Sequence, residues 1–332
     1  MATVVALSIV GTGALVAAGD DGPPRAVRPD RPTRTILRPT EIPDLDPLVV
    51  AKPSDRPVCL LVAGIGSDAP DGTFDALVAA LEARCEVHRF GGQPEHPYDT
   101  SGSLDANADE LIREARDLAK THPEIKIVAH SMGGAVVDEA FRRGLSVDDK
   151  VTTYIGLAVP HNGSTEAKMG IDLLARARAL GIASELRDVT APIQDVGSAA
   201  VRDLATVRAG PPPPGVRRID FRMATDGIVT APDAATPGVE TRTLLPSSSR
   251  WFEGHGGIVT DPTALALISA AVSGTPPDER GRLAQGQADA VSWIFEHGAP
   301  TVYKGLAAAA FAAAAALALI RRRRSLTFGF IA

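Results

Sequence analysis

The sequence has few of the residues that hold metal ions, and it lacks the motifs that bind phosphate groups. Its two cysteines and seven histidines show no paired ligand spacing of the kind that a zinc site needs. The glycine-rich stretch Gly64–Gly72 ("GIGSDAPDG") lacks both the Lys-Ser/Thr pair of a phosphate-binding loop and the spacing of a dinucleotide fingerprint. We therefore expect chemistry that uses no metal and no cofactor.

The chain also lacks an excess of positive charge. Lys and Arg number 34 against 40 Asp and Glu, which gives a net charge of −6. Nothing in this balance favours nucleic acid as a partner, so none is expected. The 332 residues are enough for one large domain or two modest ones, and they show no internal repeat.

Uncharged apolar runs stand at the two ends of the chain. Residues 305–320 are followed by four arginines, and this pattern predicts a short transmembrane helix with a cytoplasmic tail over 321–332. As a helix the run is about 24 Å long, against a hydrocarbon core of about 30 Å, so a buried alanine-rich helix is the alternative. Residues 1–19 predict a signal peptide or an N-terminal anchor, although a basic start is missing and a start codon further upstream is another alternative. We expect the remainder of the chain to lie at the cell membrane, outside the cytoplasm, with the membrane as a partner.

The part between these runs divides by composition. Residues 20–56 are dense in Pro, Arg and Asp and predict an extended linker, and 274–304 predict a polar spacer. The folded unit is expected over 57–273. Its strands are expected at Val58–Gly64, Cys85–Phe90, Ile125–Ala129, Val151–Val159, Val216–Ala224 and Val239–Pro246, and its main helices at Thr73–Arg84, Ser103–His122, Met132–Arg143 and Pro262–Val272.

Strands that alternate with amphipathic helices predict the α/β class, with a mostly parallel central sheet that is flanked by helices on both faces. A helical stretch over 160–214 is too long for a simple crossover between strands, and we expect it to form a cap over a site. Cys59 and Cys85 each begin a predicted strand. If those strands are adjacent and parallel, the two thiols lie at the same end and can form a disulfide, while two buried free thiols are the alternative.

The stretch Ile125–Gly144 ("IKIVAHSMGGAVVDEAFRRG") joins a buried-strand pattern to a helical pattern at Ser131. A sharp turn between them would hold the serine with its hydroxyl projecting, and the following helix would direct partial positive charge toward it. Larger side chains two positions before and after the serine would collide across such a bend, so Ala129 and Gly133 are residues that it permits. Ligands of open parallel sheets bind beyond the carboxyl ends of the strands, which is where this serine lies.

At this corner the chain resembles the α/β-hydrolase family, and more closely its secreted lipases and esterases. The family pattern G-x-S-x-G is here "AHSMG", Ala129–Gly133, with alanine in the first place. Two further segments, Leu157–Ser164 ("LAVPHNGS") and Gln194–Leu204 ("QDVGSAAVRDL"), are similar to segments of these lipases. The resemblance covers about residues 57–273, and it implies an α/β-hydrolase fold with a helical cap insertion.

The resemblance also implies a catalytic triad. A serine hydroxyl needs an imidazole to accept its proton, and the imidazole needs a carboxylate to hold it. In the family order of serine, acid and histidine, Ser131 is the nucleophile, Asp226 follows a predicted strand as the acid, and His255 follows the last strand as the base. Asp233 is the alternative acid, because the same loop carries both carboxylates.

Hydrogen-bond donors must also face the negative oxygen of a tetrahedral intermediate. The backbone N–H of Met132 is one expected donor. The resemblance assigns the second to the N–H of Ile65, although Ala63 stands where the family has a histidine. Gly64 is expected to contact substrate, and an ordinary tight turn is the alternative for this loop.

Two histidines complete the expected substrate-binding residues. His130 flanks the nucleophile, with a structural role as the alternative, and His161 is expected to line the approach to the site unless it only caps a helix. Together these residues predict a serine hydrolase that cleaves carboxylic esters of lipid or acyl-chain substrates through an acyl-enzyme on Ser131. A thioesterase or amidase with the same triad is one alternative, and a non-catalytic hydrolase-like binding module is another.

Overall fold

A parallel sheet forms the centre of the molecule. The computed structural model describes residues 54–67, 72–190, 197–239, 241–247, 253–275 and 282–328. Its six strands have the order β2-β1-β3-β4-β5-β6, and every pairing among the described residues is parallel. The strands are β1 Val58–Val62, β2 Glu86–Arg89, β3 Ile125–His130, β4 Val151–Leu157, β5 Arg217–Met223 and β6 Thr241–Leu244. The predicted α/β class with a mostly parallel sheet is therefore confirmed. The predicted leader, 1–19, and nearly all of the linker, 20–56, lie outside the described residues.

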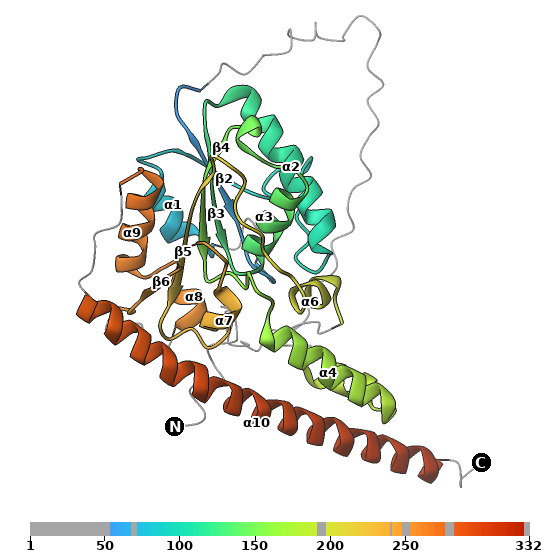
Figure 1. Cartoon of the computed structure of the whole chain (residues 1–332). Helices are drawn as coiled ribbons and strands as arrows, with labels where there is room; N and C mark the ends of the chain where they lie inside the picture. The colour runs from blue at the N-terminus through green and yellow to red at the C-terminus, as the bar shows by residue number, and fades with distance from the viewer. Residues whose placement is uncertain are drawn as a thin grey trace, which may run out of the picture.

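Helices cover both faces of this sheet (Figure 1). One face carries α1, Asp75–Leu81, and α9, Pro262–Val272, while the other carries α2, Leu104–Thr121, and α3, Met132–Arg142. All five residues of β1 are buried, which explains why that strand reads as a continuous apolar run rather than an alternating one. The remaining short helices are η3 Val147–Asp149, α7 Ala231–Ala234 and α8 Gly254–Gly257.

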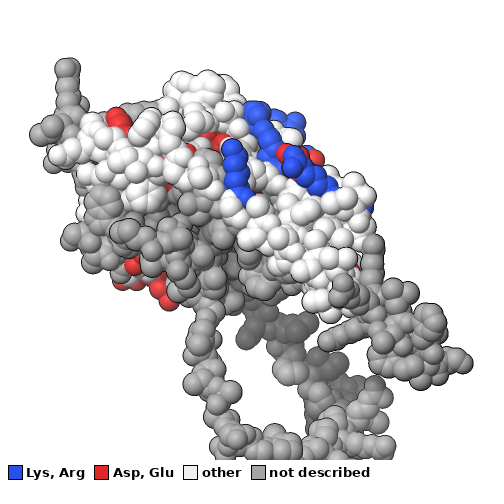
Figure 2. Space-filling model, turned by 90° about the horizontal axis from the view of Figure 1, so that it is seen from below, with Lys and Arg blue, Asp and Glu red and all other residues white. Residues whose placement is uncertain are grey.

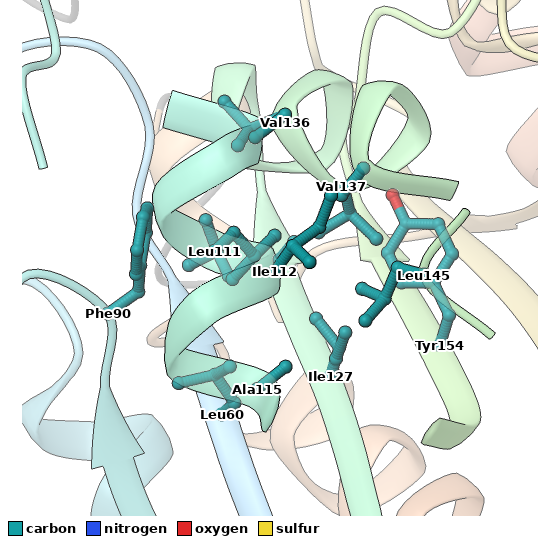
Figure 3. Close-up of a cluster of buried hydrophobic side chains, with 14 of the residues drawn as sticks. Leu60, Phe90, Leu111, Ile112, Ala115, Ile127, Val136, Val137, Leu145 and Tyr154 are labelled. Atoms are coloured by element: carbon teal, nitrogen blue, oxygen red, sulfur yellow. The ribbon is translucent and has the colours of Figure 1, made fainter. Parts of the chain in front are cut away.

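Successive strand residues contribute to two separate cores, since their side chains point to opposite faces of the sheet. Leu60 and Ile127 pack under α2 and α3, in the cluster of Figure 3 that also holds Leu111 and Val136. Their neighbour Leu61 lies in the second core, under α1 and α9. Burial on both sides fixes the register of the central strands, and this rigid frame positions the loops at the carboxyl ends.

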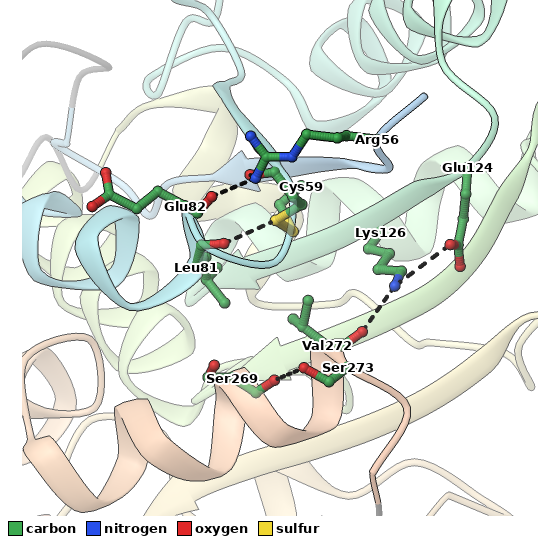
Figure 4. The surroundings of a disulfide bond; sticks show 10 residues. Arg56, Cys59, Leu81, Glu82, Glu124, Lys126, Ser269, Val272 and Ser273 are labelled. Atoms are coloured by element: carbon green, nitrogen blue, oxygen red, sulfur yellow. Dashed lines mark hydrogen bonds and ion pairs between the residues drawn. A yellow bond between two sulfur atoms is a disulfide. The ribbon is translucent and has the colours of Figure 1, made fainter. Parts of the chain in front are cut away.

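Cys59 and Cys85 form a disulfide that joins β1 to the residue before β2 (Figure 4). Their Cα atoms are 5.6 Å apart, and the bond closes a loop with a sequence separation of 26. Arg56 supports the same corner, because its guanidinium donates to the carbonyl oxygens of Glu82 and Cys85 at 2.5 and 3.0 Å. Of the two possibilities left by the sequence, the structure has the bridge.

Three helices lie between β4 and β5, within the predicted cap. They are α4 Thr165–Ala179, α5 Ala183–Thr190 and α6 Ala199–Leu204. Leu174 and Ala177 of α4 pack with Ile182 and Leu186 in a small apolar cluster that Ala314 and Ala318 of the C-terminal helix complete. The helices of the region predicted as a cap therefore pack against α10.

The C-terminal part corrects two predictions. Residues 282–328 form one helix, α10 Arg282–Phe328, so the region expected as a spacer over 274–304 is mostly helical. The physical reason is that one side of this helix packs against the rest of the protein. Ala288 and Ser292 stand four residues apart, which places them on that side, and both are buried. None of the described helices has the length and apolar character that crossing a membrane requires, so the transmembrane helix expected over 305–320 is not found.

Helix α10 runs along the side of the sheet where α7 and α8 lie (Figure 1). On the face seen in Figure 2 most described side chains are uncharged, and the basic ones gather mainly in one group that has acidic side chains beside it. The contacts of α10 reach from β6 to the cap helices α4 and α5. The folded unit therefore does not end at residue 273.

Candidate active site

The corner between β3 and α3 has the sharp geometry expected from the sequence. Ser131 has φ 54° and ψ −129°, a conformation that a residue with a side chain adopts only when its surroundings impose it. A Cβ at Gly133 would lie 2.4 Å from each of two backbone oxygens, those of Val62 and Ala63. This close approach of α3 to the end of β1 explains the glycine, and it directs the serine side chain outward from the turn.

The three residues predicted as a triad come together beyond the carboxyl ends of their strands. The Nε2 atom of His255 lies 2.8 Å from the Oγ atom of Ser131, and its Nδ1 atom lies 2.9 Å from Oδ2 of Asp226. Asp226 follows β5 and is fully buried, while His255 stands in α8 after β6. The loops after three strands, β3, β5 and β6, therefore bring the serine, the imidazole and the carboxylate into one hydrogen-bonded series.

The order of these strands and the position of the corner decide the architecture. The serine corner follows β3, which lies between β1 and β4, and the acid and the histidine follow the last two strands. The chain has the α/β-hydrolase fold.

Comparisons with known proteins give distant similarities only. No family model matches the chain, and no curated protein sequence matches it. Among solved structures, a lipase-esterase related protein from Clostridium acetobutylicum is similar at 12% identity and a TM-score of 0.46, over 67% of this chain and 95% of that one. A metagenomic carboxyl esterase is similar at 18% identity and a TM-score of 0.45, over 77% and 80% of the two chains. The type II thioesterase of the borrelidin biosynthetic cluster is similar at 22% identity and a TM-score of 0.43, over 69% and 96%.

Charge and hydrogen bonding fix the imidazole between its partners. Burial alone would lower the pKa of His255, but the charge of Asp226, its hydrogen bond to the ring and the charge of Glu166 together outweigh burial and raise the pKa. The other carboxylate oxygen, Oδ1 of Asp226, accepts hydrogen bonds from the backbone N–H groups of Ile228 and Val229 at 2.8 and 2.9 Å. Each oxygen of this carboxylate therefore has its own donors, and the carboxylate cannot rotate without losing one set.

His130 contacts the segment that carries His255. Its Nε2 atom donates to the backbone carbonyl of His255 at 3.2 Å, and the two rings are 4.8 Å apart. Burial lowers the pKa of His130 to about 3, so this ring is neutral in the folded protein. With 6% of its surface exposed, His130 holds α8 in place, and the predicted contact with substrate is corrected to the structural alternative.

The loop after β1 lies against Ser131. A Cβ at Gly64 would lie 2.9 Å from the Cβ and 3.4 Å from the Oγ of Ser131, so Gly64 borders the serine. Ile65, which follows it, is half-buried, and Met132 is fully buried at the start of α3. Tyr98 supports this loop by donating its hydroxyl hydrogen to the carbonyl of Ala63 at 2.7 Å. Nothing in the sequence pointed to Tyr98, which supports this loop at Ala63.

His161 does not line the approach to the site. Its side chain is 1% exposed, and its two ring nitrogens lie 2.5 Å from Asp138 and 3.3 Å from Asp220. Burial alone would lower the pKa of His161, but the two carboxylates outweigh it and raise the pKa. Arg218 contacts both aspartates as well, at 3.2 and 3.1 Å. The expected substrate-binding role is thus corrected: His161 belongs to a buried polar network that joins α3, β5 and the loop after β4.

Asp233, the alternative acid, is also placed away from the base. Its Oδ1 atom accepts from the hydroxyl of Thr165 at 2.9 Å, and its backbone carbonyl accepts from the N–H of Asn162 at 2.7 Å. It therefore ties α7 to the start of α4. Of the two carboxylates in this region, Asp226 is the one that contacts His255.

A second group that sequence reasoning missed connects α10 to the acid loop. Arg222, on β5, is buried and contacts Ser292 and Glu296 of α10, the latter at 2.9 Å. Burial lowers the pKa of Arg222, and the charge of Glu296 opposes that effect. The same Glu296 oxygen accepts from the N–H of Ala231 at 3.0 Å, in α7. The C-terminal helix is therefore bonded to both sides of the loop that carries Asp226.

Proposed function

We propose that this protein is a serine hydrolase that cleaves carboxylic esters through an acyl-enzyme on Ser131. The observation that supports the proposal best is the continuous series of hydrogen bonds from Ser131 through His255 to the buried Asp226. A serine hydroxyl is a weak nucleophile at neutral pH, and this arrangement supplies the base that activates it.

In the proposed reaction, the Oγ atom of Ser131 attacks the ester carbonyl carbon while Nε2 of His255 takes the hydroxyl proton. The carbonyl oxygen becomes negative, and the backbone N–H groups of Met132 and Ile65 donate to it. The imidazolium of His255 then protonates the departing alcohol. Water, deprotonated by the same imidazole, releases the acid from Ser131. The charge of Asp226 stabilises the imidazolium in both steps.

The acyl part of the substrate is proposed as a lipid or other acyl chain. The same three side chains would attack a thioester or an amide, so these substrates form the second candidate class. A binding module without catalysis is the candidate from a different class. The short Ser131–His255 contact argues against that alternative, because binding alone does not need an imidazole on the serine hydroxyl.

A fluorophosphonate probe tests the proposal on the full chain. We expect covalent labelling of the wild-type protein, no labelling of Ser131→Ala, and normal labelling of the control Ser273→Ala, whose hydroxyl donates to a carbonyl in α9. A well-folded wild-type protein that the probe leaves unlabelled would favour the binding module. A panel of p-nitrophenyl esters of increasing chain length, with a matched thioester and anilide, then ranks the substrate classes by kcat/KM.

We also propose that the folded unit works outside the cytoplasm. The support is the Cys59–Cys85 disulfide, since such bonds persist in oxidising compartments. Cell fractionation, followed by thiol labelling with and without a reductant, tests this location. Protein found in the cytoplasmic fraction with both thiols reactive would contradict the proposal.

A further inference from the structure

Three possible metal ligands meet at the edge of the sheet opposite the serine corner. Glu86 and His88 stand two residues apart on β2, so their side chains share one face of the strand. His122, which ends α2, approaches the same face. The Nε2 atoms of His88 and His122 lie 3.1 and 3.2 Å from the two carboxylate oxygens of Glu86, and one ligand atom from each residue falls within 4.8 Å of the others.

The hydrogen bonding of His122 leaves its outer nitrogen available. Its Nδ1 atom lies 3.1 Å from the carbonyl oxygen of Leu118, which can only accept, so the tautomer with the hydrogen on Nδ1 can donate to that carbonyl. The hydroxyl of Thr121, 3.0 Å from the same nitrogen, has its own acceptor in that carbonyl at 3.3 Å. In that tautomer the lone pair of Nε2 faces the carboxylate of Glu86, 3.2 Å away. Two acceptors that face each other at this distance need a cation between them, either a proton on the ring or a metal ion.

We propose that Glu86, His88 and His122 bind a divalent transition-metal ion, with Zn²⁺ as the best fit. Two imidazole nitrogens and one carboxylate are a donor set that zinc takes, with water in the fourth position. Zinc–ligand bonds of about 2.0–2.2 Å place tetrahedral ligands about 3.3–3.5 Å apart, close to the two observed contacts. Donation from an imidazole Nδ1–H to a backbone carbonyl is also the usual outer support of a histidine that binds metal through Nε2.

Exposure agrees with an ion that enters from solvent. The side chain of Glu86 is 46% exposed and that of His88 is 26% exposed, while His122 is 6% exposed and fixed by the end of α2. A rigid inner ligand and two outer ligands that can adjust allow the site to close around the ion. The partly exposed side chains of Glu86 and His88 leave the proposed ion open to the water that completes its coordination.

The position indicates a structural metal rather than a catalytic one. Ile125 begins β3 soon after His122, whereas Ser131 follows the other end of that strand, about 17 Å away at about 3.3 Å per residue. The Cys59–Cys85 bond fixes the residue directly before Glu86. A metal ion would add a second link at this edge, between β2 and α2. No zinc pattern was recognisable in the sequence because His122 is far from Glu86 and His88 along the chain.

The test uses the full chain, stripped with EDTA and dialysed without reductant so that the disulfide stays intact. Titration with Zn²⁺ alone, followed by calorimetry, should give one equivalent bound. At a hundredfold excess over Kd, the melting temperature should rise by roughly 5–10 °C. Bound Co²⁺ should show the visible absorption of a tetrahedral site.

His88→Ala and Glu86→Gln should each weaken zinc binding by at least about 100-fold, which is the upper range for the loss of an outer support alone. Both positions are partly exposed, and circular dichroism checks that the variants fold. His96→Ala is the matched control, since its Nε2 pairs with Asp117 at 3.1 Å in a different part of the surface. The control should bind zinc like the wild type. A wild type that binds no stoichiometric zinc, or His88→Ala and Glu86→Gln variants that bind as tightly as the wild type, would overturn the proposal.

Discussion

Replacing Asp226 by asparagine should stop the proposed reaction, because it moves the ring hydrogen of His255 from Nδ1 to Nε2. In the folded protein Oδ1 of Asp226 accepts from two backbone N–H groups, those of Ile228 and Val229. Asparagine must keep its oxygen there, so its NH₂ group faces Nδ1 of His255. That nitrogen then has to accept, the ring hydrogen moves to Nε2, and Nε2 can no longer take the proton of Ser131. Loss of the correct tautomer costs about 10⁴-fold in kcat, or about 5.4 kcal/mol of transition-state stabilisation.

The assay is kcat/KM for a p-nitrophenyl ester, measured for Asp226→Asn with Asp233→Asn as the matched control. Asp233 lies in the same region but contacts Thr165 instead of the imidazole, so the control should keep most of its activity. Circular dichroism and thermal unfolding show whether both variants fold. If Asp233→Asn loses activity and Asp226→Asn keeps it, the assignment of the acid from this geometry is refuted.

Three further predictions concern stability and pH. Removing the disulfide as Cys59→Ala with Cys85→Ala should lower the free energy of unfolding by about 3.5 kcal/mol for a loop of this length, and urea unfolding showing a loss below about 1 kcal/mol would contradict it. Gly133→Ala should destabilise the fold by about 1–3 kcal/mol and reduce esterase activity, because its Cβ would clash with backbone oxygens that cannot move aside. Urea unfolding and kcat that both match the wild type would contradict this prediction. The proposed base must be neutral and the pKa of His255 is raised, so kcat/KM should fall as the pH drops through that raised pKa, and a kcat/KM that stays constant into acidic pH would exclude His255 as the base.

The central strands and the corner were predictable because their signals are local. Five buried residues in β1, a strand pattern up to His130 and small residues around Ser131 each follow from the constraints of one segment. The predicted helix Pro262–Val272 agrees with α9, since Asp261 accepts from the N–H groups of its first turn. These signals do not depend on what packs from elsewhere in the chain.

The errors concern contacts between distant segments. The buried His161 contacts Asp138 of α3 and Asp220 of β5, and no feature of the sequence near His161 indicates these contacts. The packing of 282–304 against the sheet involves Arg222, whose partners Ser292 and Glu296 look like ordinary polar residues in the sequence. Contacts of this kind can be recognised only from the three-dimensional structure, because their residues are far apart in the sequence.

The contact between Arg222 and α10 has a consequence for any shortened form of the protein. A chain cut after residue 273 would keep the guanidinium beneath β5 but remove the carboxylate and the hydroxyl that neutralise and solvate it. An uncompensated cation would then sit a few residues from the acid loop. Boundaries for expression should therefore be drawn beyond Glu296, because the segment that was expected to be a spacer also supports the loop that carries Asp226.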